Sequence, residues 1–554
     1  MTPSRILAGM FVLAVACTGA PEMSDDPTPT QASPTPTLAE GEPLPVARGE
    51  FARLACNNLP PDQLHKVWTG YHPGRGGELQ FIPKFPNVLG SWFPHSGPWP
   101  YLQRVPVFLY GPGHIAEVGR VERPVTVADL APTFGELVGH PFDAPDGEVL
   151  REALAEGSDR PPKLILTVVW DGGGRNVLSA YPNRWPVVKG LIPGGAWYED
   201  ATVGSSPSVT PAIHTTIGTG AFPRAHGILD LRFQVDGELV PPVTQGPQWY
   251  LTPTLGDVYD AAMGNEPLVG MIATEAALGM IGHGSDWEDG DRDIALAQRG
   301  GVWSLTGPNA EIFEFPDYAD EAGDLEGAVA ELDAADGQRD NAWMGEPMFD
   351  DPDDLTHTPA YSVYNTELIG EVIRREGFGA DDVPDLLYVN YKQIDKVGHR
   401  WSFPSPFMEQ VVESHDTAFG DLVDILDQEV GEGEWVIALT ADHGATPQPD
   451  TTGAFVIDNK RLVDDLLAEF DDDDGARVLQ NLRVTQGWFD EDELEQNGHT
   501  IEDVARWFME YTKGDNAADP SALSAEERDE TVFSAAFPAS ILDGTLRCIQ
   551  DLTG

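Results

Sequence analysis

Three apolar segments of the sequence each end at an aspartate, and this repeated arrangement constrains the fold more than any other feature. The segments are PKLILTVVWDGGG, PDLLYVNYKQID and GEWVIALTADHG, and their aspartates are Asp171, Asp395 and Asp442. Continuous runs of apolar and β-branched residues are typical of central parallel strands, which are buried on both faces. We therefore expect an α/β fold with a central, mostly parallel sheet flanked by helices. The aspartates would lie at the carboxyl ends of strands, where open α/β sheets place their sites.

Two histidines accompany these strand ends. His399 follows Asp395 by four residues, and His443 follows Asp442 directly. Carboxylate oxygens and imidazole nitrogens are the ligands that zinc prefers in proteins. Each histidine taken alone has a structural alternative, in which it caps a helix or braces a turn. The coincidence of all three strand-end patterns favours a metal site.

A fourth segment supplies a candidate nucleophile. It runs from Ser205 to Asp230 and reads SSPSVTPAIHTTIGTGAFPRAHGILD, which is typical of a loop that enters a helix. The N-terminus of a helix favours an anion. The hydroxyl of Thr210 is a poor nucleophile unless a base or a metal lowers its pKa, and the aspartate and histidine clusters could supply that metal.

The combined motifs resemble those of a known group. The strand-end Asp171, TPAIHTTIGTGAFPRAHGI from Thr210, DKVGH from Asp395 and ADHG from Ala441 are together similar to the alkaline phosphatase superfamily, especially its type I phosphodiesterase/nucleotide pyrophosphatase branch. The resemblance implies an alkaline phosphatase-like sandwich with a small inserted cap. It also implies a single catalytic domain over residues 48–554.

The same resemblance implies two zinc ions as cofactors and an active-site role for Thr210. Thr210 would coordinate one zinc, attack phosphorus and form a phosphothreonine intermediate that water then hydrolyses. Two zinc ions about 4 Å apart can clamp the attacking and leaving oxygens of such a displacement. The implied ligands are Asp171, Asp442 and His443 for the zinc beside Thr210, and Asp395 and His399 for the other. His214 and His226 also belong to the family pattern, and we interpret them as structural.

The second zinc needs one more ligand, which these families take from a histidine after the ADHG element. Downstream of His443 the chain offers only His499, at the start of an amphipathic helix. The family's late element is instead similar to PHSGPWPYLQRVPVFLYGPG, which contains His95 near the beginning. Residues 48–155 thus match the family's C-terminal part, and we interpret the chain as circularly permuted. Permutation is tolerable because domain termini are often neighbours. His95 becomes the expected ligand, with His499 a distant alternative.

Two cysteines lie near the two ends of the folded part. In an oxidising compartment Cys56 and Cys548 could form a bridge. Two unpaired buried thiols are the alternative, and the spacing does not choose between them. The inferred permutation would bring the two segments together, which motivates the bridge.

The substrate class depends on local cations. No Lys or Arg occurs from Pro267 to Trp287, where related monoesterases often carry a Lys-x-Arg pair, although His283 or a distant Arg could substitute. We therefore expect phosphodiesters or nucleotide-like substrates, with phosphomonoesterase activity as the alternative. Ile213 replaces the Asn usual in the phosphodiesterase branch, which weakens a specific nucleotide pyrophosphatase assignment. A non-catalytic, metal-containing surface-binding protein is the alternative of another class, and no sulfatase signature surrounds Thr210.

The charge balance excludes some partners. The chain has 91 Asp and Glu against 33 Lys and Arg, a formal net charge of -58. Such acidity disfavours nonspecific attraction to nucleic-acid backbones and anionic lipid. We expect a small phosphate-ester substrate and no nucleic-acid polymer as partner.

The first residues predict export. Residues 1–17 form a signal peptide whose apolar run, Ile6 to Ala16, is too short to span a bilayer. Its LAVAC ending resembles a lipoprotein cleavage site, which would place a lipid on Cys17 as the only membrane contact. Residues 18–47 form a Pro/Thr-rich linker. The expected location is extracytoplasmic, as a cell-surface lipoprotein or otherwise as a secreted protein.

Two further expectations concern the surface. The stretch 230–360 is expected to include the cap insertion beside the site. The acidic loops Asp286 to Asp293 and Asp471 to Asp474 are expected to be solvated surface, with calcium binding as the alternative.

Overall fold

A computed structural model describes most of the chain. It covers residues 46–157, 160–241, 247–284, 293–472 and 475–543, together with Cys548. The predicted signal peptide with Cys17, most of the predicted linker, most of the first acidic loop and half of the second lie outside the described residues, and these expectations stay predictions. The last two residues of the predicted linker, 46 and 47, belong to the first helix.

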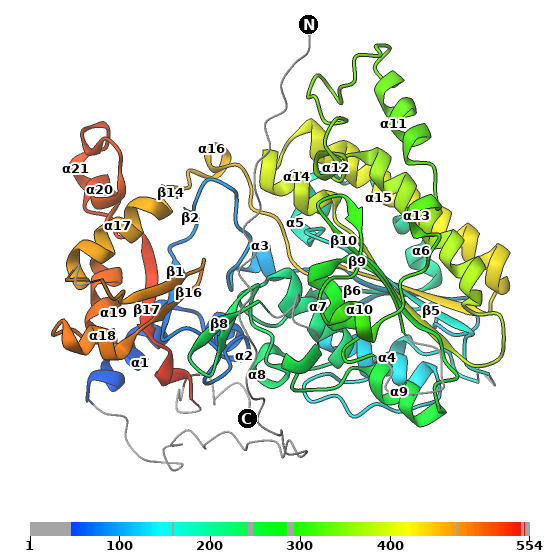
Figure 1. Ribbon diagram of the computed structural model, residues 1–554, viewed down its shortest axis with the longest axis horizontal. Helices are drawn as coiled ribbons and strands as arrows, with labels where there is room; N and C mark the ends of the chain where they lie inside the picture. Colours follow the sequence, from blue (N-terminus) through cyan, green and yellow to red (C-terminus); the bar gives the residue numbers. More distant parts are fainter. Residues whose placement is uncertain are drawn as a thin grey trace, which may run out of the picture. The chain divides into compact units, whose positions relative to one another are not determined.

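The described residues form strands and helices in alternation along much of the chain (Figure 1). The strands are β1 Leu79–Pro83, β2 Val88–Leu89, β3 Val107–Tyr110, β4 Gly119–Thr126, β5 Leu164–Trp170, β6 Ala196–Thr202, β7 Phe233–Val235, β8 Glu238–Val240, β9 Val269–Thr274, β10 Ile294–Arg299, β11 Val302–Trp303, β12 Asp385–Tyr391, β13 Trp435–Thr440, β14 Val456–Ile457, β15 Leu479–Leu482, β16 Gln486–Phe489 and β17 Phe533–Pro538.

The α-helices vary from single turns to the long α15. They are α1 Val46–Asn58, α2 Pro61–Thr69, α3 Pro100–Gln103, α4 Leu130–Leu137, α5 Arg175–Ala180, α6 Pro186–Leu191, α7 Thr210–Thr219, α8 Pro223–His226, α9 Leu255–Met263, α10 Asn309–Ile312, α11 Leu325–Ala334, α12 Pro352–Leu355, α13 Pro359–Val372, α14 Gln393–Trp401, α15 Pro406–Leu426, α16 Pro449–Thr452, α17 Asn459–Phe470, α18 Glu491–Gln496, α19 Ile501–Glu510, α20 Lys513–Asn516 and α21 Ala525–Arg528. Within the described ranges, no helix combines the length and the apolar character needed to cross a membrane.

A nine-stranded sheet is the centre of the described structure. Its order is β11-β10-β9-β12-β5-β13-β3-β6-β4, and β3 and β11 run antiparallel to their neighbours while the remaining pairs are parallel. The three apolar segments of the sequence are the adjacent strands β12, β5 and β13, and every residue of these strands is buried. The predicted fold class, a mostly parallel sheet flanked by helices, is confirmed.

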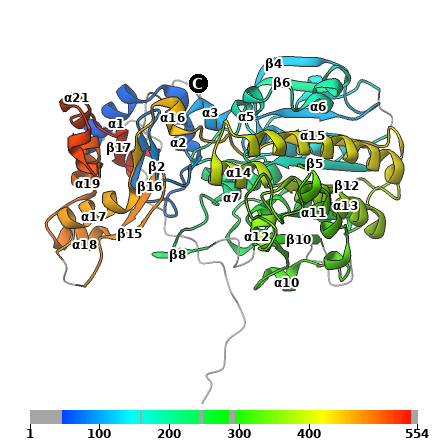
Figure 2. The same cartoon turned by 90° about the horizontal axis from the view of Figure 1, so that it is seen from above.

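Alternate residues of β5 face two different cores. Leu164, Leu166 and Val168 pack with residues of α13 and α15, whereas Ile165 and Val169 pack with residues of α4 and α7. Figure 1 shows α13 and α15 above the sheet and α4 and α9 below it, and Figure 2 shows α15 lying along the sheet from above. Because both faces are covered, polar side chains reach solvent mainly where the strands end.

A second sheet has a core of its own and was not expected. Its order is β15-β16-β1-β17, all antiparallel, so the chain before residue 90 pairs with the chain after residue 478. Helices α1, α17 and α19 bury their apolar residues against it. A disulfide joins Cys56 and Cys548 in this part, with Cα atoms 6.1 Å apart, so the bridge and not the pair of free thiols is the arrangement found.

The cap insertion expected within 230–360 stays a prediction, and part of that range belongs to the central sheet. Strands β9 and β10 lie inside it but belong to the central sheet, because their continuous apolar sequences are buried on both faces. By contrast, no described residue of α11 is buried. The cap prediction therefore applies only to the segments of this range outside the sheet.

Candidate active site

The strand ends deliver the predicted acidic residues to one edge of the central sheet. Asp171 directly follows β5, and one residue, Ala441, separates Asp442 from the end of β13. Asp395 lies in the first turn of α14, just after β12, and His399 lies one turn later on the same helix. Residues four apart share a helix face, so Asp395 and His399 point the same way.

The first potential metal-binding group is Asp171, Asp442 and His443, and all three side chains are fully buried. The Nε2 atom of His443 lies 3.3 Å from Asp442 Oδ2 and 3.5 Å from Asp171 Oδ1. Ligand atoms in tetrahedral zinc sites with bonds of ~2.0–2.1 Å are about 3.3 Å apart. These two distances are compatible with a bound metal ion.

The second group is His95, Asp395 and His399. Asp395 Oδ1 lies 3.4 Å from His95 Nε2 and 3.3 Å from His399 Nε2. The structure thus brings His95 next to Asp395 and His399, which were the only two ligands that the later motifs supplied for the second metal. The two groups adjoin, because His443 Nε2 is also 3.9 Å from Asp395 Oδ1.

Backbone carbonyls orient all three histidines. The Nδ1 atoms of His95, His399 and His443 lie 3.1, 2.9 and 3.0 Å from the carbonyl oxygens of Ser208, Trp92 and Gly444. Because Nδ1 donates to a carbonyl, the Nε2 lone pair is directed into the site. This arrangement is the usual outer-shell support of a metal-ligating histidine.

Two buried polar atoms of the first group indicate that a metal cation would fit the site. Among the described residues, neither Asp442 Oδ2 nor His443 Nε2 has a hydrogen-bond partner. Burial alone would lower the pKa of His443, but the charge of Asp442 raises it to about 9. Burial and the charge of Asp442 raise the pKa of Asp171 to about 7. The same concentrated negative field favours a metal cation, so the residues present fit one.

The loop that carries His95 is anchored to both neighbouring loops. The hydroxyl of Ser208 donates to the carbonyl of His95 at 2.9 Å, and Thr446 Oγ1 donates to the carbonyl of Pro94 at 2.6 Å. The rings of His95 and His443 stack with centroids 3.4 Å apart. His499 instead packs edge-on against Phe470 beside the second sheet, so it belongs to neither group.

Thr210 is the first residue of α7, whose N-terminus carries a partial positive charge. His214 donates from Nδ1 to the Thr210 carbonyl at 2.8 Å and contacts Asn390 Nδ2 through Nε2 at 3.0 Å. Burial lowers the pKa of His214 to about 4, which keeps the ring neutral. His226 contacts the hydroxyl of Thr216 at 3.1 Å. Both histidines bond to residues of α7, and their structural interpretation stays a prediction.

Sequence analysis missed two residues of this site. Lys392 Nζ lies 2.8 Å from Asp171 Oδ1, 2.9 Å from Asp395 Oδ2 and 3.1 Å from the Thr210 hydroxyl. Asn390 Nδ2 donates to Asp171 Oδ2 at 3.0 Å. The signal that could have found them is their position: they are polar residues that end an otherwise apolar strand directly before Asp395.

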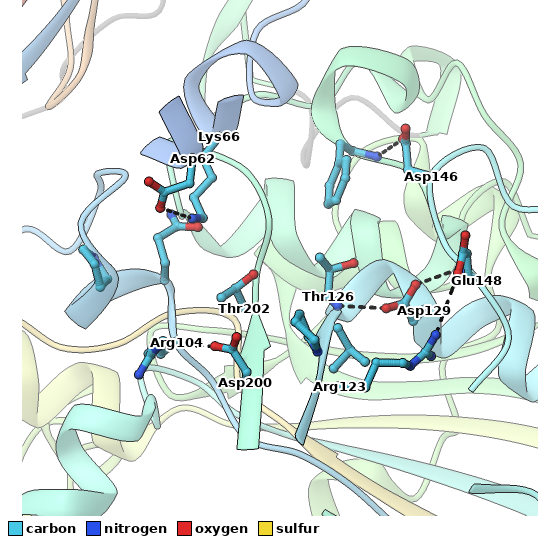
Figure 3. Close-up of a pocket in the computed structure, with 15 residues that line it drawn as sticks. Asp62, Lys66, Arg104, Arg123, Thr126, Asp129, Asp146, Glu148, Asp200 and Thr202 are labelled. Atoms are coloured by element: carbon cyan, nitrogen blue, oxygen red, sulfur yellow. Dashed lines mark hydrogen bonds and ion pairs between the residues drawn. The ribbon is translucent and has the colours of Figure 1, made fainter. Parts of the chain in front are cut away.

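A separate cavity of about 560 Å³ lies beside α2, α3, β4 and β6, and its lining is drawn in Figure 3. None of the predicted site residues lines it. Its charged groups have partners, because Lys66 pairs with Asp62 at 3.3 Å and Arg104 pairs with Asp200 at 3.3 Å. Asp129 accepts from two backbone amides. The reactive groups therefore lie at the sheet edge and not in this cavity.

The fold and the site together define a class of protein, an α/β protein with two adjoining potential metal-binding groups and a helix-terminal hydroxyl between strand ends. The family model for type I phosphodiesterase / nucleotide pyrophosphatase matches residues 165–531. The chain belongs to this family, and its expected place in the alkaline phosphatase superfamily is confirmed.

Individual relatives are more distant. The alkaline phosphatase PafA of Elizabethkingia meningoseptica is 28% identical over 192 residues, which are 33% of this chain and 34% of that protein. The alkaline phosphatase PhoD of Zymomonas mobilis is 25% identical over 361 residues, or 59% of this chain and 62% of that one. The chain thus spans between a third and less than two thirds of these relatives. A crystal structure of PafA aligns with 63% of this chain and 76% of that chain, at 18% identity and a TM-score of 0.49.

Proposed function

We propose that this chain hydrolyses phosphoric esters with Thr210 as the nucleophile. The observation that carries the proposal is the convergence of two three-residue ligand groups on one hydroxyl at a helix N-terminus. Lys392 contacts Asp171 of the first group, Asp395 of the second and Thr210 at once. The family match supports the reaction class.

Two divalent cations, which we propose to be zinc, would be held by the two groups. When bound, such cations withdraw charge from phosphoryl oxygens and favour ionisation of a nearby hydroxyl. The proposed ligands are Asp171, Asp442, His443 and Thr210 for the first cation, and His95, Asp395 and His399 for the second.

The chain's own residues then account for the chemistry. The Thr210 oxygen bonds to phosphorus as the bond to one ester oxygen breaks, the hydroxyl proton passes to solvent, and the leaving oxygen takes a proton from water. Water then hydrolyses the phosphothreonine, which still carries the second ester group when the substrate is a diester. The N-terminus of α7 stabilises the anionic group. The bond from His214 to the Thr210 carbonyl and the burial of Thr210 hold its hydroxyl in place.

The preferred substrate is a small phosphodiester or a nucleotide-like ester. The absence of Lys and Arg from Pro267 to Trp287 supports this preference, and His283 is engaged with Asp257, with Nδ1 and Oδ2 3.0 Å apart. The alternative is a phosphomonoesterase, which the alkaline phosphatase names of two relatives favour. A non-catalytic surface-binding protein would keep the metal groups but turn nothing over.

The order of the segments supports circular permutation as part of the proposal. The family match begins at residue 165, whereas His95 and β3 precede it. Strand β3 nevertheless pairs with β13 and β6 inside the central sheet. Residues 48–155 would then stand for the family's C-terminal part, within one catalytic domain over 48–554.

Export to an oxidising compartment completes the proposal. The disulfide between Cys56 and Cys548 supports it, because such bonds form and persist outside the cytosol. A lipid on Cys17 would be the only membrane anchor, and Cys17→Ser would then release the protein from the membrane fraction.

The test of activity compares two substrates in one assay. We expect the purified protein to hydrolyse bis-p-nitrophenyl phosphate, to lose this activity with a chelator and to regain it with zinc. p-Nitrophenyl phosphate measures the monoester alternative under the same conditions. If zinc-loaded protein turns over neither ester, the hydrolase proposal is wrong.

A further inference from the structure

We infer that Lys392 binds the phosphoryl group that is transferred to Thr210. This inference deepens the proposed function and rests on it. The stretch from Pro267 to Trp287 contains no Lys or Arg that could bind this group. Lys392, which lies much later in the sequence, would supply the missing cation. Nothing in the metal-ligand pattern assigns Lys392 a role.

The ammonium of Lys392 lies at the centre of the site. Its Nζ atom is 3.1 Å from Thr210 Oγ1, 2.8 Å from Asp171 Oδ1 and 2.9 Å from Asp395 Oδ2. The side chain is only 18% exposed, so packing and three polar contacts fix its position. A lysine that merely covered the surface would not be held at the nucleophile.

The position of Lys392 is compatible with a cation in the second group, whereas in the first group it shares Asp171 Oδ1 and the Thr210 hydroxyl with the proposed cation. Asp395 directs Oδ1 toward the two histidines of its group, whereas Oδ2 faces Lys392. The ammonium therefore uses the oxygen of Asp395 that the ligand group leaves over. Binding of a metal by Oδ1 does not require Lys392 to move away from Thr210.

The distance to Thr210 places Lys392 within reach of a transferred phosphoryl group. Phosphorus would become bonded to Oγ1, and the other phosphoryl oxygens are its immediate neighbours. A donor already at hydrogen-bonding distance from Oγ1 can therefore reach one of them. The ammonium has three donors on a flexible stem and is a frequent phosphate ligand.

The negative charge of the site strengthens the case for a contact between Lys392 and the phosphoryl group. Asp171, Asp395 and Asp442 place three carboxylates around the nucleophile, in a chain whose formal net charge is -58. The proposed cations offset the repulsion between these groups and an incoming phosphate in part, and a buried ammonium adds to this more strongly than a solvated one. A dianionic monoester gains more from Lys392 than a monoanionic diester.

The alternative is that Lys392 only braces the two carboxylates. The neighbouring Lys396 provides a matched control, because it lies on α14 one turn further on and its Nζ pairs with Asp353 at 2.6 Å. Removal of either lysine changes the net charge by the same amount. Of the two lysines, Lys392 contacts Thr210, Asp171 and Asp395, whereas the ion pair of Lys396 is with Asp353.

The experiment measures binding of inorganic phosphate by calorimetry and hydrolysis of both p-nitrophenyl esters, with zinc content determined for each protein. For Lys392→Met with two zinc ions bound, we expect phosphate to bind at least about 10-fold more weakly and kcat/KM to fall about 100-fold, more for the monoester than for the diester. Lys392→Arg should keep most of the phosphate affinity, and Lys396→Met should match the wild type.

Phosphate affinity within twofold of wild type in zinc-loaded Lys392→Met would overturn the inference. So would a loss of affinity that disappears once zinc is restored to saturation, since Lys392 would then act only through the metal groups. If the wild type turns over neither ester, the hydrolase proposal fails and the inference fails with it. If the wild type hydrolyses an ester but zinc-loaded Lys392→Met keeps wild-type phosphate affinity, only the inference fails.

Discussion

His95 Nε2 lies 3.4 Å from Asp395 Oδ1, although Asp395 lies inside the segment that matches the family and His95 lies well before it. The second ligand group is therefore assembled from distant parts of the chain. Its stability depends on the anchoring of an early loop by Ser208 and Thr446, which bond to the carbonyls of His95 and Pro94.

Substitution of His95 tests this assembly. We expect His95→Ala to weaken the second zinc by at least about 100-fold, because loss of a ligand costs more than the 10- to 100-fold typical of an outer-shell partner. Zinc analysis after gel filtration should then give about one ion per chain in place of two. The control is His499→Ala, which changes a histidine packed against Phe470 and should retain both ions. Equal losses in the two variants would contradict the assignment.

Substitution of Thr210 tests the nucleophile. We expect Thr210→Ala to lower kcat/KM by at least about 10⁴-fold, because removal of a nucleophile abolishes the covalent route. Thr210→Ser keeps a hydroxyl and should retain measurable activity. Mass spectrometry of wild type that is acid-quenched during turnover of p-nitrophenyl phosphate should find phosphate on the peptide that contains Thr210. Phosphate on another peptide, or normal turnover by Thr210→Ala, would disprove the role.

Asn390 should affect the metal affinity of the first group without being a metal ligand itself. Its Nδ2 atom donates to Asp171 Oδ2 and also contacts His214 Nε2, so it fixes both. We expect Asn390→Ala to weaken zinc binding by about 10- to 100-fold. Competition with a chelating dye measures the effect. Asn87→Ala removes a comparable buried amide, which bonds to the Val532 carbonyl, and should leave zinc affinity unchanged.

A pH-dependent contribution to stability is expected from Glu78. Burial raises its pKa from 4.5 to about 7, although it accepts a bond from the amide of Phe489 at 2.8 Å. Between these two pH values the folded state holds a proton that the unfolded chain releases, so Glu78 costs stability increasingly as pH rises to about 7 and fully above it. Glu78→Gln should therefore raise stability at pH 8 by roughly 1–3 kcal/mol and change little at pH 4.

Thermal unfolding at pH 4 and pH 8 checks the sign of this effect. A Glu78→Gln protein that is less stable than the wild type at pH 8 would mean that the carboxylate, and not the protonated acid, is the form the fold prefers.

The sequence predicted the fold class and the positions of three aspartates at strand ends, but not the second sheet. Asp171, Asp395 and Asp442 were predictable because apolar strands with β-branched residues mark the central sheet, and the chain must become polar where such strands end. His95 was predictable only through a family resemblance, since no local pattern connects it with Asp395.

Other features depend on pairing across long distances. Strand β1 pairs with β16 and β17 from the far end of the chain. The sequences of such short strands contain too few residues to predict a second sheet. The side chains of Asn390 and Lys392 also needed the structure, because the direction in which a strand-end residue points depends on register.

The most direct test of the central claim is a crystal structure of the zinc-loaded protein with anomalous diffraction recorded at the zinc edge. We predict two anomalous peaks, one among Asp171, Asp442 and His443 and one among His95, Asp395 and His399. A single peak, or zinc bound away from these residues, would contradict the proposed two-metal site.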